Sequence, residues 1–401
     1  MLKRIYEDII VKHYSLHNEA IFLSGPRQVG KTTISEAVAK NFDHTTYLNW
    51  DNTEDRHRIL EGNIPLLKEK VLGKSLVTFD EIHKFDRWKT YLKGLFDHHK
   101  NHISFLVTGS SRLNVYRQGG DSMMGRYFLY RAHPLSVGEL LNPSACDTEI
   151  KAPLKISDEY FEALIDFGGF PKPYTAANVR FYNRWKNQRL ERLFEEDIRD
   201  TLRIQEAAKI QVLANILAYQ AGFQVNYTNL SKSIQVADQT IRTWITYLES
   251  FYYCFTIKPW SSNVARSLVK EPIVYLWDWA SVANKGMKHQ NLIASHLLKA
   301  VHFWTDEGFG LFELWYLRDQ QKNEVDFLVT KDNQPWLMVE VKSSFKEPLS
   351  KSLYHFQNQL KAPYCFQVGI DGDYIDEDCF NSKNLYAPLK VPARTFLSQL
   401  V

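Results

Sequence analysis

Long apolar runs are missing from this chain of 401 residues, and no stretch approaches the roughly 18 uninterrupted apolar residues of a membrane-spanning helix. Residues 1–8 also lack the apolar core of a signal peptide. The four cysteines are far apart and form neither a CxxC pair nor a Cys/His cluster, which argues against a zinc site and a disulfide scaffold. We therefore expect a soluble cytoplasmic protein with no membrane partner.

A strong excess of charge is missing as well. The formal net charge of +3 neither requires nor excludes a nucleic-acid partner, so any phosphate-binding surface has to be local. Hydrophobic residues make up 44% of the chain and charged residues 24%, which is ordinary for a globular protein with buried cores. At about 150 residues per domain, the length predicts about two to four domains.

Short apolar strands alternate with helical stretches in the first third of the sequence. The expected strands cover residues 20–24, 47–50, 75–79 and 103–107. This alternation predicts an α/β domain over residues 1–150, with a parallel sheet and helices on both of its faces. From residue 158 to 205 the pattern is wholly helical, which predicts a helical lid over residues 151–205.

Two further modules are expected toward the C-terminus. Three helices, the last at residues 239–251, and a strand at 254–257 fit a winged helix-turn-helix over residues 206–271. Strands then return at residues 314–317, 325–329 and 336–341. They indicate a separate α/β domain over residues 272–401.

One glycine-rich segment follows the first expected strand and opens a helix. Its residues are Gly25, Pro26, Arg27, Gln28, Val29, Gly30, Lys31, Thr32 and Thr33. Glycine lets the backbone curl so that amide hydrogens point at phosphate oxygens, and the helix adds the positive end of its dipole. Lys31 would reach the β- and γ-phosphates and Thr32 would bind magnesium, so ATP and Mg²⁺ are the expected cofactors.

A pair of carboxylates ends the strand at residues 75–79. Asp80 stands where it can approach a magnesium ion held by Thr32, and Glu81 can polarise the attacking water. An Asp-Glu pair after a strand is common surface chemistry on its own. Beside the glycine-rich loop, it predicts the metal-side carboxylate and the catalytic base of an ATPase.

Two more candidates for the nucleotide site come later in the chain. Ser110, or alternatively Thr108, stands at the tip of the strand at residues 103–107 and would sense the γ-phosphate, while a serine-rich turn is the plain alternative. Arg126 could reach the nucleotide of a neighbouring subunit and stabilise the charge of the transition state. A solvated surface arginine is equally compatible with the pattern.

The C-terminal part contains a spacing typical of nuclease cores. Thirteen residues separate Asp326 from Glu340, and Lys342 follows two positions later, which matches a PD-(D/E)xK core. In such a core Asp326 and Glu340 would converge on a divalent metal while Lys342 orients or activates water. The alternation of charged residues also arises simply from an exposed strand face.

The third helix of the winged module presents a polar face suited to DNA. Its candidate contact residues are Gln239, Thr240, Arg242 and Thr243, which can reach base edges or phosphates. Winged helices also serve as packing modules between ATPase subunits, so a protein is the alternative partner of this helix.

A cluster of histidines is interpreted as solvated helix side chains rather than metal ligands. Its members are His98, His99 and His102.

These motifs together resemble the predicted AAA+ superfamily ATPases of bacteria and archaea that carry a C-terminal DUF4143 region. The resemblance covers nearly the whole chain and rests on residues 25–33, 79–84, 108–111, 125–126, 134–139 and 168–171. It implies an AAA+ core followed by a winged-helix segment and a nuclease-like domain. It also implies that the chain forms homo-oligomers, rings among them, when nucleotide is bound.

One position departs from the family pattern. In the related ATPases a Glu-Asn pair commonly precedes an apolar helix, and here Gln290 stands in place of the glutamate. This exchange removes a charge from the expected metal shell. A domain that binds branched or duplex nucleic acid, or a partner, is therefore favoured over an efficient nuclease.

The resulting hypothesis is an AAA+ ATPase that binds DNA and remodels it or moves along it. The alternative is a nucleotide-controlled switch or defence protein in which ATP gates a nuclease-like effector. A third class is a protein-assembly scaffold whose ATP site sets assembly alone.

Overall fold

The computed structural model describes residues 2–68, 71–109, 123–198, 204–261, 271–381 and 387–401. Within these ranges the chain forms two compact units. One unit comprises Met1–His133 and Pro143–Ala145, and the other comprises Pro134–Asn142 and Cys146–Val401. No helix in the described ranges is long and apolar enough to cross a membrane.

The first unit is built on a parallel sheet with the strand order β2-β3-β4-β1-β5. Its strands are β1 (Ala20–Ser24), β2 (His44–Asn49), β3 (Ser75–Asp80), β4 (Ile103–Gly109) and β5 (Tyr127–Arg131). Both faces of β1 and β3 are buried, as their continuous apolar runs predict for a sheet covered on two sides. The predicted parallel α/β architecture is therefore confirmed.

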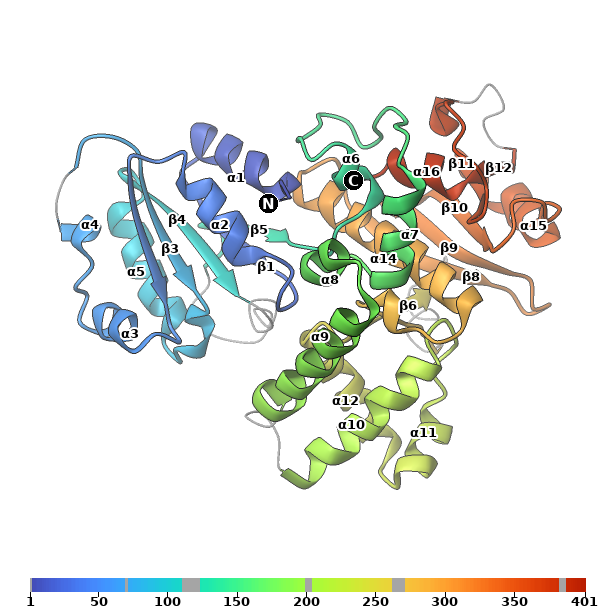
Figure 1. Cartoon of the computed structure of the whole chain (residues 1–401), viewed down its shortest axis with the longest axis horizontal. Coiled ribbons are helices and arrows are strands. Elements are labelled where there is room, and N and C mark those ends of the chain that lie inside the picture. The colour runs from blue at the N-terminus through green and yellow to red at the C-terminus, as the bar shows by residue number, and fades with distance from the viewer. Residues whose placement is uncertain (1, 69–70, 110–122, 199–203, 262–270, 382–386) are drawn as a thin grey trace. The chain divides into compact units, whose positions relative to one another are not determined.

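Helices cover both faces of this sheet, with α1 and α2 on one face and α5 on the other (Figure 1). The helices of the unit are α1 (Ile5–Leu16), α2 (Lys31–Ala39), α3 (Thr53–Leu60), α4 (Pro65–Lys68), the 3-10 turn η1 (Ile82–Lys84) and α5 (Trp88–His99). On the α5 face, Trp88, Leu92 and Phe96 pack against strand residues such as Phe22 and Phe105.

The second unit contains a mixed sheet with the order β12-β11-β10-β9-β8-β6-β7. Its strands are β6 (Cys254–Pro259), β7 (Ile273–Leu276), β8 (Phe312–Arg318), β9 (Glu324–Lys331), β10 (Gln334–Lys342), β11 (Tyr364–Gly369) and β12 (Leu389–Pro392). The accompanying helices are α14 (Lys285–Asp306), α15 (Lys351–Leu360) and α16 (Ala393–Ser398), with the 3-10 turns η4 (Trp279–Ser281) and η5 (Cys379–Asn381). Leu353 and Phe356 of α15 pack against Leu328 and Met338 of the sheet.

The remaining helices of the second unit precede this sheet in the chain. They are α6 (Val137–Leu141), α7 (Asp158–Phe167), α8 (Pro171–Ala176), α9 (Val179–Arg192), the π-helical turn η3 (Leu193–Ile198), α10 (Ile204–Tyr219), α11 (Tyr227–Ile234) and α12 (Asp238–Ser250). The run from α7 to η3 agrees with the helical pattern of the sequence.

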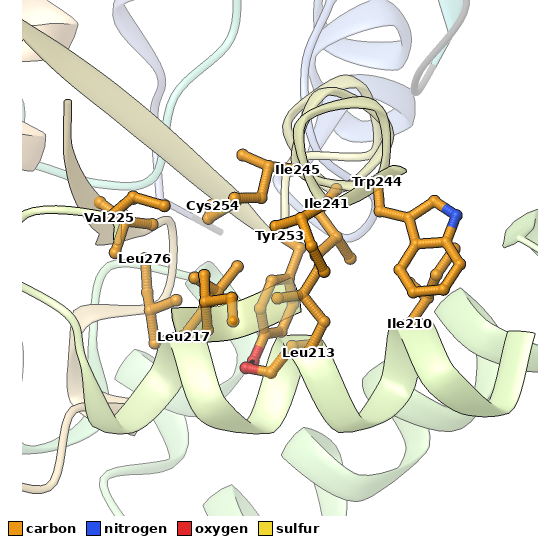
Figure 2. Packing of buried hydrophobic residues seen from close by; sticks show 14 of the residues in the cluster. Ile210, Leu213, Leu217, Val225, Ile241, Trp244, Ile245, Tyr253, Cys254 and Leu276 are labelled. Carbon is orange, nitrogen blue, oxygen red and sulfur yellow. Dashed lines mark hydrogen bonds between the residues drawn. The ribbon is translucent and has the colours of Figure 1, made fainter. Parts of the chain in front are cut away.

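Helices α10 and α12 share one core with the strands that follow them. Figure 2 shows Leu213 and Leu217 of α10 beside Ile241 and Ile245 of α12, with Cys254 at the start of β6. The strand predicted as a wing is β6, which pairs with β7 and, on its other side, with β8 of the large sheet. The segment predicted as a helix-turn-helix is therefore continuous with the C-terminal sheet, and a border at 271/272 separates two paired strands.

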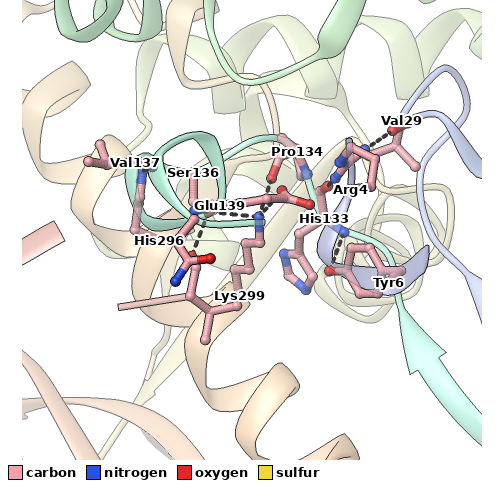
Figure 3. A network of polar contacts seen from close by, with 12 residues as sticks. Arg4, Tyr6, Val29, His133, Pro134, Ser136, Val137, Glu139, His296 and Lys299 are labelled. Atoms are coloured by element: carbon pink, nitrogen blue, oxygen red, sulfur yellow. Dashed lines mark hydrogen bonds and ion pairs between the residues drawn. The ribbon is translucent and has the colours of Figure 1, made fainter. Parts of the chain in front are cut away.

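The segment after β5 also differs from the predicted borders, since residues 134–142 belong to the second unit rather than to a domain ending at residue 150. The reason is a buried ion pair within that unit (Figure 3). Lys299 of α14 donates to the Glu139 carboxylate of α6 at 2.5 Å and to the Ser136 hydroxyl at 2.7 Å. The side chains of Lys299 and Glu139 are only 1% and 0% exposed.

Candidate functional site

The glycine-rich loop connects β1 to α2 and uses left-handed backbone at two places. Gly30, with φ of 102°, is the N-cap of α2, and Gln28 has φ of 65°. At Gly25 a side chain would collide with the Ala132 carbonyl oxygen, so only glycine fits there. The loop therefore adopts the curled path that turns amide groups toward an anion at the start of a helix.

Lys31, the first residue of α2, is held inside this loop. Its ammonium donates to the carbonyl oxygens of Gly25 at 2.9 Å and Pro26 at 3.0 Å. Only 7% of the residue is exposed. A cation fixed at the mouth of an amide-lined loop is suited to binding phosphate oxygens.

Asp80 is surrounded by hydroxyl groups from three neighbouring elements. Thr108 donates to one carboxylate oxygen at 2.5 Å, and Tyr47 donates to the other at 2.5 Å. Thr32 of α2 donates to that second oxygen at 3.5 Å. Strand β4 lies between β1 and β3 and is in register with both, which brings Thr108 beside Asp80 at the sheet edge where the loop lies.

The Thr32 hydroxyl and the Asp80 carboxylate are hard oxygen donors of the kind that Mg²⁺ prefers, so this pair fits the expected ion. Tyr47 was not singled out from the sequence. It belongs to β2, and only the pairing of β2 with β3 brings its hydroxyl to Asp80. Burial raises the pKa of the Tyr47 hydroxyl, with the adjacent Asp80 adding to the shift, so the tyrosine stays a hydrogen-bond donor at neutral pH.

Glu81 takes a left-handed conformation, with φ of 55°, directly after β3. Its amide donates to the Thr108 carbonyl at 3.0 Å, which ties the turn to β4. Burial raises the pKa of the Glu81 carboxyl, while the Lys31 charge acts in the opposite direction. The structure thus brings Lys31, Thr32, Asp80 and Glu81 to one edge of the sheet.

The two remaining candidates of this site have different outcomes. Ser110 lies outside the described residues. Arg126 precedes β5, and the Ala20 amide at the start of β1 donates to its carbonyl at 2.9 Å. Arg126 therefore lies at the N-terminal end of the strands, opposite the end that carries the phosphate-binding loop. The five residues of β1 separate that end from Gly25, a distance of about 16 Å along the strand. The Arg126 guanidinium forms two hydrogen bonds with Asp97, at 2.7 and 3.1 Å.

The histidine cluster at the end of α5 fits the expectation of solvated side chains, since His98 is exposed and its ring contacts the ring of His99. In the described part of the chain, no group of three or more His, Cys, Asp or Glu side chains could hold a metal ion.

In the second unit, the structure brings Asp326, Glu340 and Lys342 together. The Val341 amide on β10 donates to one Asp326 oxygen on β9 at 2.7 Å. Lys342 donates to Glu340 at 2.9 Å. Gln290 of α14 donates from its amide nitrogen to the other Asp326 oxygen at 2.6 Å. The spacing in the sequence therefore corresponds to a real cluster.

The electrostatics of this cluster follow from its burial. Burial first, and then the charge of Glu340, raise the pKa of the Asp326 carboxyl. Burial likewise raises the pKa of Glu340, against the opposing effect of Lys342. Both Asp326 oxygens already accept hydrogen bonds, one of them from the Gln290 amide. Two N–H donors therefore already occupy the Asp326 oxygens at which a divalent cation would bind.

Asn291 explains why Gln290 lies at that position. Its side chain accepts a hydrogen bond from the Leu276 amide and donates one to the Leu276 carbonyl, each at 2.8 Å. These two bonds fix α14 against β7. The neighbouring residue on the helix is thereby directed at Asp326.

On α12, the exposed residues among the DNA candidates are Gln239 and Arg242, while Thr240 and Thr243 are half-buried. The Thr243 hydroxyl donates to the Gln239 carbonyl at 3.0 Å within the helix. The Arg242 guanidinium lies 3.7 Å from the centre of the Tyr227 ring on α11. Stacking of this kind restricts the arginine and presents its outer edge to solvent.

Helix α9 carries a basic surface that the sequence reading did not single out. Its 14 residues include five Lys/Arg side chains and one acid, Glu191. Arg180 and Arg184 are exposed and lie one helical turn apart, whereas Arg189 turns inward and packs on Phe170. The signal was the number of basic residues within one helix.

A buried strand, an amide-lined loop capping a helix, a fixed lysine and a carboxylate beside the loop threonine define a P-loop nucleotide-binding domain. Comparison with protein families agrees with this class: residues 17–141 match the AAA domain family. Residues 285–378 match a domain of unknown function, DUF4143, and residues 158–286 match another, DUF8612. An AAA domain and a DUF4143 region are thus both matched, which confirms the resemblance.

Similar proteins occur in bacteria and archaea. The uncharacterized protein Rv2008c of Mycobacterium tuberculosis is 25% identical over 83% of this chain and 72% of its own length. The uncharacterized protein MJ1637 of Methanocaldococcus jannaschii is 21% identical over 93% of this chain and 84% of its own length.

Two solved structures are among those to which this chain is similar. The Walker-type ATPase PABY2304 of Pyrococcus abyssi has 13% identity and a TM-score of 0.44, with 71% of this chain and 95% of that chain covered. AMPPCP-bound DnaA from Aquifex aeolicus has 14% identity and a TM-score of 0.32, with 61% of this chain and 87% of that chain covered.

Proposed function

We propose that this protein binds ATP with Mg²⁺, hydrolyses it, and uses the cycle to act on nucleic acid. The observation that carries the proposal is the convergence of Lys31, Thr32, Asp80 and Glu81 at one sheet edge, since phosphoryl transfer needs positioning and charge stabilisation above all. Nucleic acid as the substrate has separate support from basic helix surfaces in the second unit.

Each side chain of the nucleotide site has a distinct role. The loop amides and Lys31 bind the phosphates, while Thr32 and Asp80 hold the ion. When bound, Mg²⁺ neutralises charge on the β- and γ-phosphates. Glu81 orients and polarises the attacking water, and Thr108 and Tyr47 keep the Asp80 carboxylate in one orientation.

Arg126 can act on a phosphate only in another copy of the chain, because it lies at the sheet edge away from its own loop. We therefore include a homo-oligomer, with a ring as one form, in the proposal. Within one chain Asp97 pairs with Arg126, so an interface that uses the guanidinium has to compete with this ion pair.

Two exposed surfaces support nucleic acid as the partner. Arg242 on α12 and the Arg180–Arg184 turn of α9 offer guanidinium groups that bind phosphate oxygens well. Gln239 adds a side chain able to read a base edge. Binding through such groups depends strongly on salt concentration.

A nucleotide-controlled switch or defence protein with a nuclease-like effector is the second candidate, and the cluster of Asp326, Glu340 and Lys342 favours it. The Gln290 amide at Asp326 weighs against efficient cutting. Metal-dependent cleavage of DNA that disappears in Asp326→Ala would move this candidate to first place. A protein-assembly scaffold is the third candidate.

The experiment is an ATPase assay with single-stranded, duplex, forked and four-way DNA at two salt concentrations. We expect at least one DNA form to stimulate hydrolysis, more strongly at low salt. The double variant Arg180→Ala/Arg184→Ala should lose stimulation, whereas Lys155→Ala/Lys351→Ala removes the same charge at other exposed positions and should keep it. Hydrolysis unaffected by every DNA form would leave the scaffold as the better account.

A further inference from the structure

Arg4 lies just before α1 and is almost completely buried, with 2% of the residue exposed. One guanidinium nitrogen donates to the Val29 carbonyl of the phosphate-binding loop at 2.6 Å. Another donates to the His133 carbonyl, also at 2.6 Å. Figure 3 shows the Arg4 side chain between these two residues.

The contact with Val29 bears directly on the loop. Amide hydrogens can point at an anion only where the carbonyl groups of the same segment are directed elsewhere. A charge-assisted hydrogen bond from a buried arginine holds the Val29 carbonyl toward Arg4. Gly30, which follows, takes the left-handed conformation that begins α2.

The contact with His133 concerns the point at which the chain leaves the first unit. Tyr6 supports the same segment, since its hydroxyl donates to the Arg131 carbonyl at 2.8 Å and accepts from the His133 amide at 3.1 Å. The next residue, Pro134, belongs to the second unit, where its carbonyl accepts from Lys299 at 3.2 Å. The peptide bond between His133 and Pro134 is therefore anchored on both sides.

We propose that Arg4 is a positioning residue of the nucleotide site that links the phosphate-binding loop to the junction between His133 and Pro134. The inference rests on the proposed ATP binding. A guanidinium is planar and rigid, so one that bridges two carbonyls couples their positions. When phosphate binding adjusts the loop, the His133 carbonyl moves with it, and nucleotide state reaches the start of the second unit.

The test compares Arg4→Met, Arg4→Lys and a matched control, Tyr6→Phe, in the full-length chain. Tyr6→Phe removes the hydrogen bond between the Tyr6 hydroxyl and the His133 amide, two residues from Arg4 in the chain. It leaves the hydrogen bond between Arg4 and Val29 intact. We expect the ATP dissociation constant to rise by about tenfold or more in Arg4→Met. Arg4→Lys keeps the charge and should recover only part of the affinity, and Tyr6→Phe should stay within about twofold of wild type.

The second readout is hydrogen exchange of residues 134–142 with and without ATP. The wild type should show an ATP-dependent change in this segment, and Arg4→Lys should lose it at an ATP concentration that saturates its site. Arg4→Lys also decides the matter if Arg4→Met fails to fold. If Arg4 had a purely structural role, its variants would lose stability but keep the ATP-dependent change in hydrogen exchange of residues 134–142.

The outcomes separate this inference from the proposed function. Wild-type protein that binds no ATP contradicts the proposed function itself. Wild-type binding together with unchanged affinity and an unchanged exchange response in both Arg4 variants overturns the inference and leaves the proposed function standing. Equal loss of affinity in Tyr6→Phe also overturns it, because the loss then follows the contact with His133 rather than the contact with the loop.

Discussion

Replacement of Lys299 by methionine should destabilise the second unit severely. The ammonium donates to Glu139, to the Ser136 hydroxyl and to the Pro134 carbonyl, and neither charged side chain is more than 1% exposed. Methionine keeps most of the apolar stem but removes the charge and all three donors. The Glu139 carboxylate then stays buried without its ion-pair partner.

Loss of one partner of a buried ion pair costs about 3–5 kcal/mol. The lower end applies here, because the nearby Lys151 also interacts with the Glu139 charge. Lys151 itself donates to the Asn142 carbonyl at 2.9 Å, so it cannot simply replace the lost bond. Against a domain stability of about 5–15 kcal/mol, a loss of about 3 kcal/mol is large.

Native-state hydrogen exchange of α14 is the suitable assay, since it reports on the second unit alone. Lys285→Met, an exposed change on the same helix, should alter the opening free energy by no more than about 0.5 kcal/mol. The double variant Glu139→Gln/Lys299→Met should recover much of the loss, because no uncompensated charge is then buried. An opening free energy of Lys299→Met within about 1 kcal/mol of wild type would refute the reasoning.

Three further substitutions test separate parts of the structure. Tyr47→Phe removes one donor to Asp80 and should raise the Mg²⁺ concentration for half-maximal ATPase by about tenfold, with ATP affinity nearly unchanged. Burial lowers the pKa of His296 from 6.5 to about 4, so between these two pH values the folded protein binds fewer protons than the unfolded chain. The stability that the neutral ring contributes is complete above pH 6.5 and is lost as pH falls toward 4, by up to about 3 kcal/mol. In His296→Gln the free energy of unfolding, measured with urea, should therefore vary less with pH over that window. Gln290→Glu adds a third carboxylate to the buried cluster of Asp326 and Glu340, so in EDTA the variant should melt at a lower temperature than wild type and recover with Mn²⁺; a melting temperature independent of the metal would contradict the electrostatic account of this cluster.

The parts of the fold that the sequence predicts are those with local signals. The loop at residues 25–33 is contiguous, and its strand and helix follow from apolar runs and periodicity, so β1 and α2 appear where expected. Asp80 ends an apolar strand and Glu81 follows it, which makes their position at the C-terminal end of that strand predictable. Asp326 and Glu340 are recognisable for the same reason, because each belongs to a strand with a clear pattern.

The contacts that escape prediction join residues far apart in the chain. Glu139 and Lys299 are 160 positions apart, and Arg4 is 129 positions from His133. Nothing in a single sequence indicates such pairs, because their partners depend on how helices and strands pack. The same limit applies to β6, whose apolar pattern predicts a strand but not its pairing with β8 in the larger sheet.

The most direct measurement is phosphate release from Mg²⁺-ATP by Glu81→Gln, with ATP binding measured on the same protein. Wild type should hydrolyse ATP, and Lys31→Ala should fail to bind it, because the phosphates lose the cation held in the loop. Glu81→Gln should bind ATP with affinity close to wild type while hydrolysis falls by about a hundredfold or more. Turnover by Glu81→Gln at the wild-type rate would contradict the assignment of the catalytic base and with it the central account of this site.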